Sequence, residues 1–293
     1  EFPLGESRSP RCVVFLHGLA GSASSPYIVR TAKKFRELGY RTIRVNLRGA
    51  ACDGKFAQRP YHAGCSDDVQ FLMEELSRRH PETQFSLVGF SLGGNVVLKW
   101  AGEYGDQWTG RVTKIVAANP PIDLAVCSSR IGTVLGGFYD RYFARILYGK
   151  VKAVPHWWEL SRFCRLGTRP RGIVEFDDAF TAPMNNFASA LEYYADASAA
   201  RVMGRITLPT TIVSAEDDPL VPSSLFRETA LSRSIDVHMT RSGGHLAYMG
   251  RRGVDPDRYW LDWRIIEWIE QSYDNSGRLL IPSDCDDMLL RAV

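Results

Sequence analysis

The sequence predicts an α/β fold, with a mostly parallel sheet and helices on both of its faces. Short apolar segments rich in β-branched residues alternate with amphipathic segments of helical length, and strands joined in this way usually pair in parallel. A length of 293 residues is enough for one large α/β domain with an insertion. The predicted strands, each ended by turn residues, are 12–16, 85–88, 115–118, 210–213 and 235–239.

Three helices can be placed from their ends and from the spacing of their apolar residues. The first, at about 26–38, has Ser25 as its N-cap, and Gly39 ends it. The second, near 67–79, carries aspartates in its first turn and arginines in its last, as the helix macrodipole favours. The third, at about 258–272, has an apolar stripe typical of core packing. We expect all three helices to be scaffold.

The segment Gly89-Phe90-Ser91-Leu92-Gly93 lies between a predicted strand and a predicted helix. In that setting the pattern G-x-S-x-G is typical of a nucleophile elbow, a sharp turn that holds the serine in a strained conformation and exposes its Oγ. The two glycines let the strand and the helix pass closely. We therefore predict Ser91 as a nucleophile, the alternative being an ordinary glycine-rich turn.

A serine nucleophile needs a base, and the base needs an acid that orients it. In hydrolases with this elbow the acid follows the serine in the chain. We predict Asp218 as the acid, because it follows the strand 210–213 and precedes a proline whose fixed φ restricts the loop. Asp217, one residue earlier, is expected to be a solvated loop residue. Asp123, which follows the strand 115–118, is the alternative acid.

The predicted base is His245, which follows the last predicted strand and two glycines that permit a close approach to the sheet edge. A solvent-exposed loop histidine is the alternative for this position. His238 lies within that strand, and we expect it to be structural.

Backbone amides are expected to form an oxyanion hole. The strand 12–16 runs into His17-Gly18-Leu19, and a strand that ends in this way leaves amides exposed. We predict that the N–H groups of Leu19 and Leu92 together bind the developing oxyanion, and loss of such a donor typically raises the barrier by roughly 3–4 kcal/mol. His17 itself is expected to be a structural hydrogen-bonding residue.

These motifs, in this order, resemble the α/β-hydrolase superfamily, and within it the bacterial YheT-type hydrolases and the related eukaryotic ABHD1- and ABHD3-like proteins. The resemblance implies carboxylester hydrolysis, often of short- or medium-chain acyl groups, with Ser91, Asp218 and His245 as the catalytic triad. Some relatives resemble acyltransferases that use an alcohol in place of water. The resemblance covers nearly the whole chain and rests, besides the elbow, on His17-Gly18-Leu19, Ser25-Pro26-Tyr27, Asn46-Leu47-Arg48-Gly49, Tyr61-His62-Ala63-Gly64, Phe176-Asp177-Asp178, Phe180-Thr181-Ala182-Pro183, Tyr193-Tyr194, Asp217-Asp218-Pro219 and Gly243-Gly244-His245.

The chain departs from the family pattern in two places. Ala50-Ala51-Cys52 replaces a stretch expected to be richer in glycine or serine, and this loop is expected to border the site. Only sixteen residues precede His17, fewer than the usual antiparallel edge strands require, and the chain has no initiating Met. We therefore expect a processed, trimmed or incomplete form.

The alternation of strands and helices breaks after the strand 115–118. We expect a hydrolase core at 1–119, a helical cap insertion at 120–205, the resumed core at 206–273 and a C-terminal tail at 274–293. Eight aromatic residues of the cap are compatible with an acyl pocket, but we expect more than half of them to form the cap's own core. They are Phe138, Tyr139, Tyr142, Phe143, Tyr148, Trp157, Trp158 and Phe163.

The expected cap is basic. Residues 121–174 contain nine Lys and Arg against three Asp and Glu, so this segment carries +6 and the remainder −3. A solvated face explains this charge, and the alternative is peripheral contact with an anionic membrane or a phosphate-bearing lipid.

Composition limits the partners. A net charge of +3 gives no support for nucleic-acid binding. Six scattered cysteines without C-x-x-C spacing predict free thiols in a reducing compartment, which favours the cytoplasm. No apolar run is long enough for a membrane span, and no nucleotide or metal motif is present. We therefore expect no cofactor and a small-molecule acyl ester as substrate, with the oligomeric state open.

Two alternatives to ester hydrolysis remain at this point. A hydrolase-fold protein that only binds its ligand usually lacks a triad member, and here all three are present, so we favour an enzyme. Among enzymes, transfer to an alcohol and hydrolysis of phospholipids use the same triad.

Overall fold

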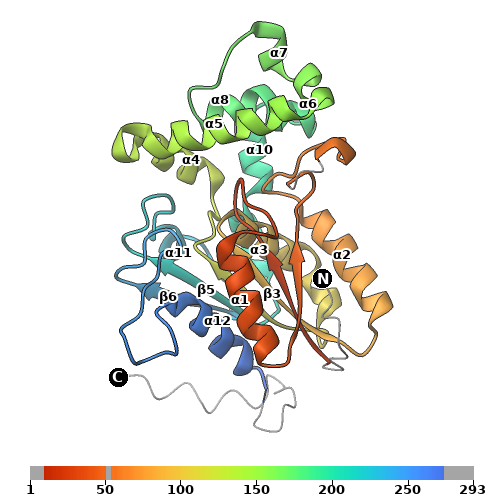
Figure 1. Cartoon of the computed structure of the whole chain (residues 1–293), viewed down its shortest axis with the longest axis vertical. Helices are drawn as coiled ribbons and strands as arrows, with labels where there is room; N and C mark the ends of the chain where they lie inside the picture. The colour runs from red at the N-terminus through yellow and green to blue at the C-terminus, as the bar shows by residue number, and fades with distance from the viewer. Residues whose placement is uncertain (1–9, 51–53, 274–293) are drawn as a thin grey trace.

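The computed structural model describes residues 10–50 and 54–273, and there the predicted α/β fold is confirmed (Figure 1). The described strands form one sheet in the order β2-β1-β3-β4-β5-β6, and every neighbouring pair is parallel. The strand β2 had not been predicted separately. The bounds are β1 Arg11–Leu16, β2 Arg41–Val45, β3 Gln84–Phe90, β4 Val112–Ala118, β5 Thr210–Ala215 and β6 Ile235–Thr240.

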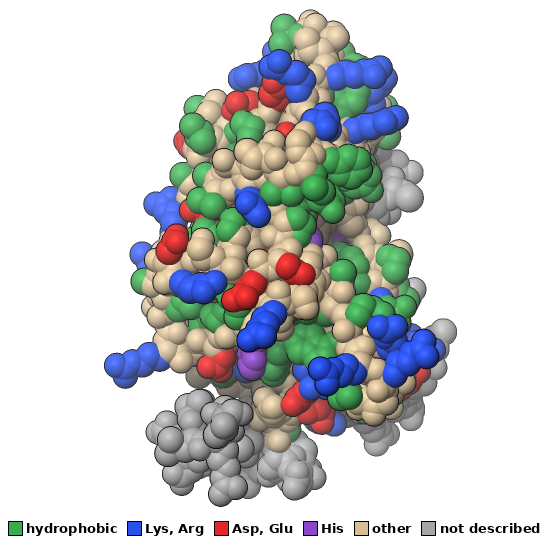
Figure 2. Space-filling model, turned by 90° about the vertical axis from the view of Figure 1, so that its left-hand side faces the viewer, with side chains coloured by type: hydrophobic (Ala, Val, Ile, Leu, Met, Phe, Trp, Pro, Cys, Tyr) green, Lys and Arg blue, Asp and Glu red, His purple; other side chains and the backbone are tan. Residues whose placement is uncertain are grey.

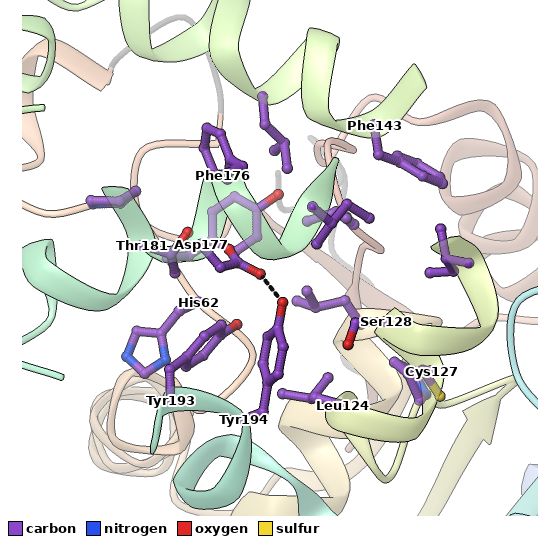
Figure 3. Close-up of a pocket in the computed structure, with 18 of the residues that line it drawn as sticks. His62, Leu124, Cys127, Ser128, Phe143, Phe176, Asp177, Thr181, Tyr193 and Tyr194 are labelled. Atoms are coloured by element: carbon purple, nitrogen blue, oxygen red, sulfur yellow. Dashed lines mark hydrogen bonds between the residues drawn. The ribbon is translucent and has the colours of Figure 1, made fainter. Parts of the chain in front are cut away.

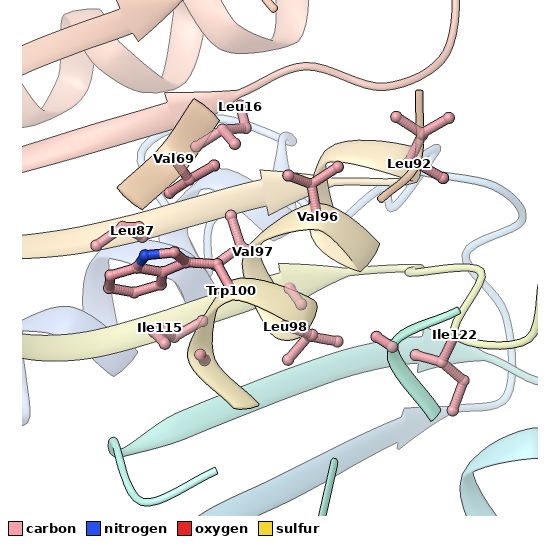
Figure 4. Packing of buried hydrophobic residues seen from close by; sticks show 14 of the residues in the cluster. Leu16, Val69, Leu87, Leu92, Val96, Val97, Leu98, Trp100, Ile115 and Ile122 are labelled. Carbon is pink, nitrogen blue, oxygen red and sulfur yellow. The ribbon is translucent and has the colours of Figure 1, made fainter. Parts of the chain in front are cut away.

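Helices cover both faces of the sheet because successive strand residues point to opposite sides. Val13 and Phe15 of β1 pack with α1 and α12, whereas Val14 and Leu16 pack with α2 and α3. Figure 4 shows Val96, Val97 and Trp100 of α3 in the apolar cluster on one face of the sheet. The bounds of these helices are α1 Pro26–Glu37, α2 Ser66–Arg79, α3 Leu92–Tyr104 and α12 Trp260–Glu270.

The predicted helix ends agree closely with α1, with one difference in detail. Ser25 stands at the N-cap position of α1 but makes no capping hydrogen bond. Its Oγ accepts instead from the N–H of Ser22 at 3.0 Å, within the preceding loop. Gly39 follows α1 with φ +83°, the left-handed conformation that ends many helices.

The chain between β4 and β5 is helical and carries its own apolar cluster. Figure 1 shows α4 to α8 at one end of the molecule, beyond the sheet. Trp157, Phe163, Phe176 and Phe180 form the centre of this cluster. Besides short 3₁₀ and π turns, the helices are α4 Leu124–Thr133, α5 Phe138–Ala153, α6 Pro155–Leu160, α7 Arg162–Leu166, α8 Ile173–Phe176, α9 Ala182–Met184 and α10 Ala190–Ala197.

Trp157 and Asn95 tie this helical segment to the rest of the fold. The Trp157 indole donates to the carbonyl of Ala57 at 2.9 Å. Its ring lies so close to Gly49 that a Cβ there would come within 2.5 Å of it. On α3, the buried Asn95 amide donates to the carbonyls of Ala63 and Ala197 at 3.0 and 2.8 Å. Figure 2 shows Lys and Arg side chains at the cap end of the molecule and over the rest of this face as well.

Candidate active site

Ser91 stands at the turn between β3 and α3 in a strained backbone conformation. Its φ and ψ are 51° and −122°, a region that residues with a side chain rarely adopt. The flanking glycines are required by space: a Cβ on Gly89 would lie 2.4 Å from the carbonyl oxygen of Gly93. A Cβ on Gly93 would lie 2.6 Å from the carbonyl oxygen of His17. This is the geometry that the G-x-S-x-G pattern predicts.

The three residues predicted as a triad lie within hydrogen-bonding distance of one another. Ser91 Oγ is 2.8 Å from His245 Nε2, and His245 Nδ1 is 2.9 Å from Asp218 Oδ2. They come from the loops that follow β3, β5 and β6, at the carboxyl edge of the sheet. The tautomer protonated on Nδ1 satisfies both contacts, because Nδ1–H then donates to the carboxylate and Nε2 accepts the serine proton.

The Asp218 carboxylate is fully buried, and it is well supplied with donors. Its Oδ1 accepts from the backbone N–H groups of Leu220 and Val221 at 2.8 and 3.2 Å. Its Oδ2 accepts from Asn119 Nδ2 at 2.6 Å in addition to His245. A buried charge needs such partners, and this set holds the carboxylate in one orientation.

The other carboxylates considered for the acid have different roles. Asp123 caps α4, where its Oδ1 accepts from the N–H of Val126 at 3.0 Å. Asp217 is exposed as expected, yet its Oδ1 accepts from the N–H groups of Gly243 and Gly244 at 2.9 and 2.8 Å. Asp217 therefore tethers the loop that carries His245. This role was not predicted from the sequence, which indicated only a solvated loop residue.

The loop after β1 offers one free amide beside the serine. The N–H of Gly18 donates to Tyr27 Oη at 3.0 Å, and that of Ala20 donates to Tyr61 Oη at 2.9 Å. Between them, the N–H of Leu19 has no hydrogen-bond partner among the described residues. The loop lies against the elbow, since a Cβ on Gly18 would be 3.1 Å from Ser91 Cβ.

A second amide belongs to Leu92, the first residue of α3. An N–H at this position has no partner within its own helix. Neither the Leu19 nor the Leu92 N–H has a hydrogen-bond partner among the described residues, and their assignment to an oxyanion hole stays a prediction.

His17 and His238 are structural, as expected. His17 is buried, and its Nδ1–H donates to the carbonyl of Gly18 at 2.8 Å while its Nε2 accepts from the N–H of Leu47 at 3.2 Å. Burial lowers the pKa of His17. His238 lies on β6 with its ring 4.8 Å from that of Trp268.

An apolar pocket opens at Ser91 and His245 and extends under the cap helices. Its walls are mostly apolar, as is usual for ligand pockets. Of the eight cap aromatics, Phe143 and Trp157 line the pocket. Phe138 and Tyr142 are 57% and 51% exposed. The remaining four pack within the cap cluster or against the main core: Tyr139, Tyr148, Trp158 and Phe163.

The pocket wall contains one buried carboxyl group. Asp177, next to Phe176, accepts a hydrogen bond of 2.7 Å from Tyr194 Oη (Figure 3). Burial raises the pKa of Asp177 to about 6. Asp177 was part of a family motif in the sequence but had no predicted role.

The expectations for the cysteines and for the loop after Gly49 can be compared with the structure only where residues are described. Cys12, Cys65, Cys127 and Cys164 are free thiols. Residues 51–53 and the tail 274–293, which include the remaining cysteines and most of the unusual Ala50-Ala51-Cys52 stretch, lie outside the described residues. Among the described helices, none combines the length and apolar character needed to span a bilayer.

Comparisons with known proteins agree with the fold and the site. A family model described as the α/β hydrolase fold matches residues 11–251. YheT of Escherichia coli, which carries a provisional esterase designation, is 30% identical over 283 residues, covering 92% of this chain and 79% of YheT. Mouse phospholipase ABHD3 is 27% identical over 243 residues, covering 81% of this chain and 58% of ABHD3.

Another relative extends the range of named activities. The medium-chain fatty acid ethyl ester synthase/esterase 2 of Saccharomyces cerevisiae is 26% identical to this chain. The match covers 82% of this chain and 58% of the yeast protein. Among solved structures, an esterase of Pyrococcus furiosus has a TM-score of 0.55 at 18% identity, covering 91% of this chain and 84% of that esterase. At this identity the structural likeness shows the fold alone. The chain belongs to the α/β-hydrolase fold family, in the group of YheT- and ABHD3-like proteins, and it is a hydrolase of the esterase and lipase type.

Proposed function

We propose that this protein is a serine carboxylesterase that hydrolyses short- to medium-chain acyl esters through Ser91, His245 and Asp218. The observation that carries the proposal is the continuous hydrogen-bond chain from Ser91 Oγ through His245 to Asp218. Ser91 and His245, at the serine end of this series of hydrogen bonds, line an apolar pocket. A nucleophile, a base and an orienting acid in this geometry perform acyl transfer on several unrelated folds.

In the proposed mechanism His245 takes the proton of Ser91 as Oγ attacks the ester carbonyl. The N–H groups of Leu19 and Leu92 bind the oxyanion of the tetrahedral intermediate. His245 then gives its proton to the leaving alcohol, and an acyl-enzyme remains on Ser91. Water, deprotonated by His245, attacks this acyl-enzyme and releases the carboxylic acid, which restores the serine.

The substrate class rests on the pocket and on the relatives. Apolar walls favour an acyl chain over a polar group, and aromatic side chains such as Phe143 and Trp157 limit its length. The yeast relative's name includes medium-chain fatty acid ethyl esters. That name also includes synthesis, so an alcohol in place of water as acyl acceptor is the second candidate function. The name of mouse ABHD3 supports phospholipids as a further candidate substrate.

Hydrolysis of p-nitrophenyl esters from acetate to laurate tests the proposal. We expect the wild-type protein to prefer short to medium chains, and Ser91→Ala to lose turnover on every ester while remaining folded by circular dichroism. Product analysis in the presence of ethanol separates the acceptors, because transfer produces an ethyl ester. Folded wild-type protein without turnover on any ester would instead favour a phospholipid-only substrate or a binding protein.

A further inference from the structure

Lys150 reaches from the cap to the loop that carries the predicted oxyanion donor. It lies on α5, and its Nζ donates to the carbonyl oxygen of Ala20 at 2.9 Å. Ala20 follows Leu19 directly, and Lys150 lines the same pocket as Ser91 and His245. A cationic side chain therefore lines a mostly apolar pocket, beside the loop of the predicted oxyanion donor.

The Lys150 ammonium has no carboxylate to balance its charge among the described residues. Its hydrogen-bond partner among the described residues is a neutral carbonyl, so two of its three N–H donors are left for a ligand. Burial lowers the pKa of Lys150, as expected for a cation without an anionic neighbour. The other charged group of the pocket, Asp177, is in contrast satisfied by Tyr194.

The loop has hydrogen bonds of its own that hold its shape. The N–H groups of Gly18 and Ala20 are bonded to Tyr27 and Tyr61. The N–H of Gly21 also closes the turn onto the carbonyl of Gly18 at 3.1 Å. A half-buried cation is costly, and a neutral donor would serve the Ala20 carbonyl equally well. The charge therefore calls for an explanation beyond anchoring the loop.

We propose that Lys150 binds an anionic group of the substrate, a phosphate or a carboxylate attached a few bonds from the scissile ester. The inference rests on the proposed esterase function and narrows its substrate class to esters that carry a negative charge near the carbonyl. The ammonium donates charge-assisted hydrogen bonds to this group, and such bonds are roughly twice as strong as neutral ones. The acyl chain occupies the apolar part of the pocket.

Two matched substrate pairs test this proposal, each pair differing only in the charged group. The first is 1-butyrylglycerol against its 3-phosphate, with the charge in the alcohol part. The second is ethyl butyrate against monoethyl succinate, in which a carboxylate replaces the terminal methyl group of the acyl part. The quantity compared is the ratio of kcat/KM for the charged ester to kcat/KM for its neutral partner.

We expect Lys150→Met to lower this ratio roughly 10- to 100-fold for at least one pair, mainly through KM, because hydrogen bonds to charged groups have about that effect on binding. The pair that responds identifies the anion as a phosphate on the alcohol or a carboxylate on the acyl group. Lys150→Arg should keep the ratio close to the wild-type value, since it keeps the charge. Lys150→Gln keeps a donor for the Ala20 carbonyl without the charge, and should behave like the Met variant.

Lys152 provides the matched control, because it is an exposed lysine two residues further along α5. Its ammonium lies 5.6 Å from the centroid of the Trp158 ring and does not line the pocket. Lys152→Met makes the same change in net charge, and we expect an unchanged ratio.

Two results would overturn the proposal. One is an equal loss of kcat/KM on charged and neutral esters, in Lys150→Met alone or in Lys150→Gln as well, which leaves the ratio unchanged and would assign Lys150 to anchoring the loop. The other is an unchanged kcat/KM on all four esters. Turnover of the neutral esters that depends on Ser91 shows in either case that the esterase function itself stands.

Discussion

Asn119 Nδ2 donates to Asp218 Oδ2 at 2.6 Å, and the same carboxylate oxygen accepts from His245 Nδ1. Asn119 Nδ2 also donates to the carbonyl of Gly244 at 3.2 Å, beside the histidine. Its Oδ1 accepts from Tyr248 Oη at 2.8 Å. One buried amide thus joins the end of β4 to the loops that carry the acid and the base, and we infer that Asn119 is a positioning residue.

Asn119→Ala is expected to lower kcat roughly 10- to 100-fold with little change in KM, since a lost hydrogen bond to a charged group corresponds to about that factor. Asn119 has φ +46°, so an alanine there also adds backbone strain. Asn119→Gly removes the amide without this strain and is the control. Steady-state kinetics on a p-nitrophenyl ester measures both variants, and a wild-type kcat in the glycine variant would refute the positioning role.

The identity of the acid can be tested by a pair of isosteric changes. Asp218→Asn should lower kcat about 10⁴-fold, because an amide at this position favours the wrong imidazole tautomer. Asp123→Asn should leave both kcat and the unfolding midpoint nearly unchanged, since asparagine caps a helix about as well as aspartate. Kinetics on the same ester decides between them, and the reverse pattern would assign the acid to Asp123.

The sequence was sufficient for the fold and for the three predicted triad residues because each has a local signal. The elbow needs Gly89 because a Cβ there would meet the carbonyl of Gly93, four residues on, and Ser91 is therefore visible in a short pattern. Asp218 and His245 each follow a β-branched or apolar strand, and parallel strands bring their carboxyl ends to one edge. Sequence order alone thus predicted which side chains would meet.

Asn119 and Lys150 could not be assigned roles in the same way, because their partners lie far away in the chain. Asn119 stands at the boundary between the predicted core segment 1–119 and the predicted cap, and no role was assigned to it from the sequence. Its bond to Asp218 spans 99 positions, and that of Lys150 to Ala20 spans 130. A contact of this kind depends on how the cap and the loops pack, and no local pattern encodes it.

The strain at Ser91 predicts a trade-off between activity and stability. Holding a residue with a side chain in this conformation costs about 1–3 kcal/mol of stability, and a glycine would relieve that strain. Glycine also loses more backbone entropy on folding than alanine, which takes back roughly 0.5–1 kcal/mol of the gain. Ser91→Gly and Ser91→Ala should both be inactive, with the glycine variant about 1 kcal/mol more stable in urea unfolding.

Ser86, in the middle of β3, is the control for that comparison. Its Oγ is 2.9 Å from Thr113 Oγ1, a contact that glycine and alanine remove equally. Because an ordinary strand position favours alanine, Ser86→Gly should be the less stable variant of its pair. Equal stabilities for the two Ser91 variants would show that the elbow stores no strain.

Asp177 predicts how stability depends on pH. Its pKa is about 6 in the fold, against an ordinary value of 3.8, so the folded state holds its proton more tightly than the unfolded state does. The stability contributed by this group is therefore present below about pH 4 and is lost as the pH rises through 6. Asp177→Asn carries no such charge, and its amide oxygen still accepts from Tyr194.

The free energy of unfolding of Asp177→Asn, relative to wild type, should therefore rise by about 2 kcal/mol between pH 4 and pH 8. Glu175, on the preceding turn, is the control, because the Arg171 side chain lowers the pKa of this carboxyl. The Glu175 side chain is 43% exposed, so Glu175→Gln should show a small change of the opposite sign over the same range. Urea unfolding at four pH values measures, for each variant, the difference in free energy of unfolding from wild type. A constant gap for Asp177→Asn would mean that the carboxyl titrates normally, and the buried wall of the pocket would then contain an ordinary, hydrated acid.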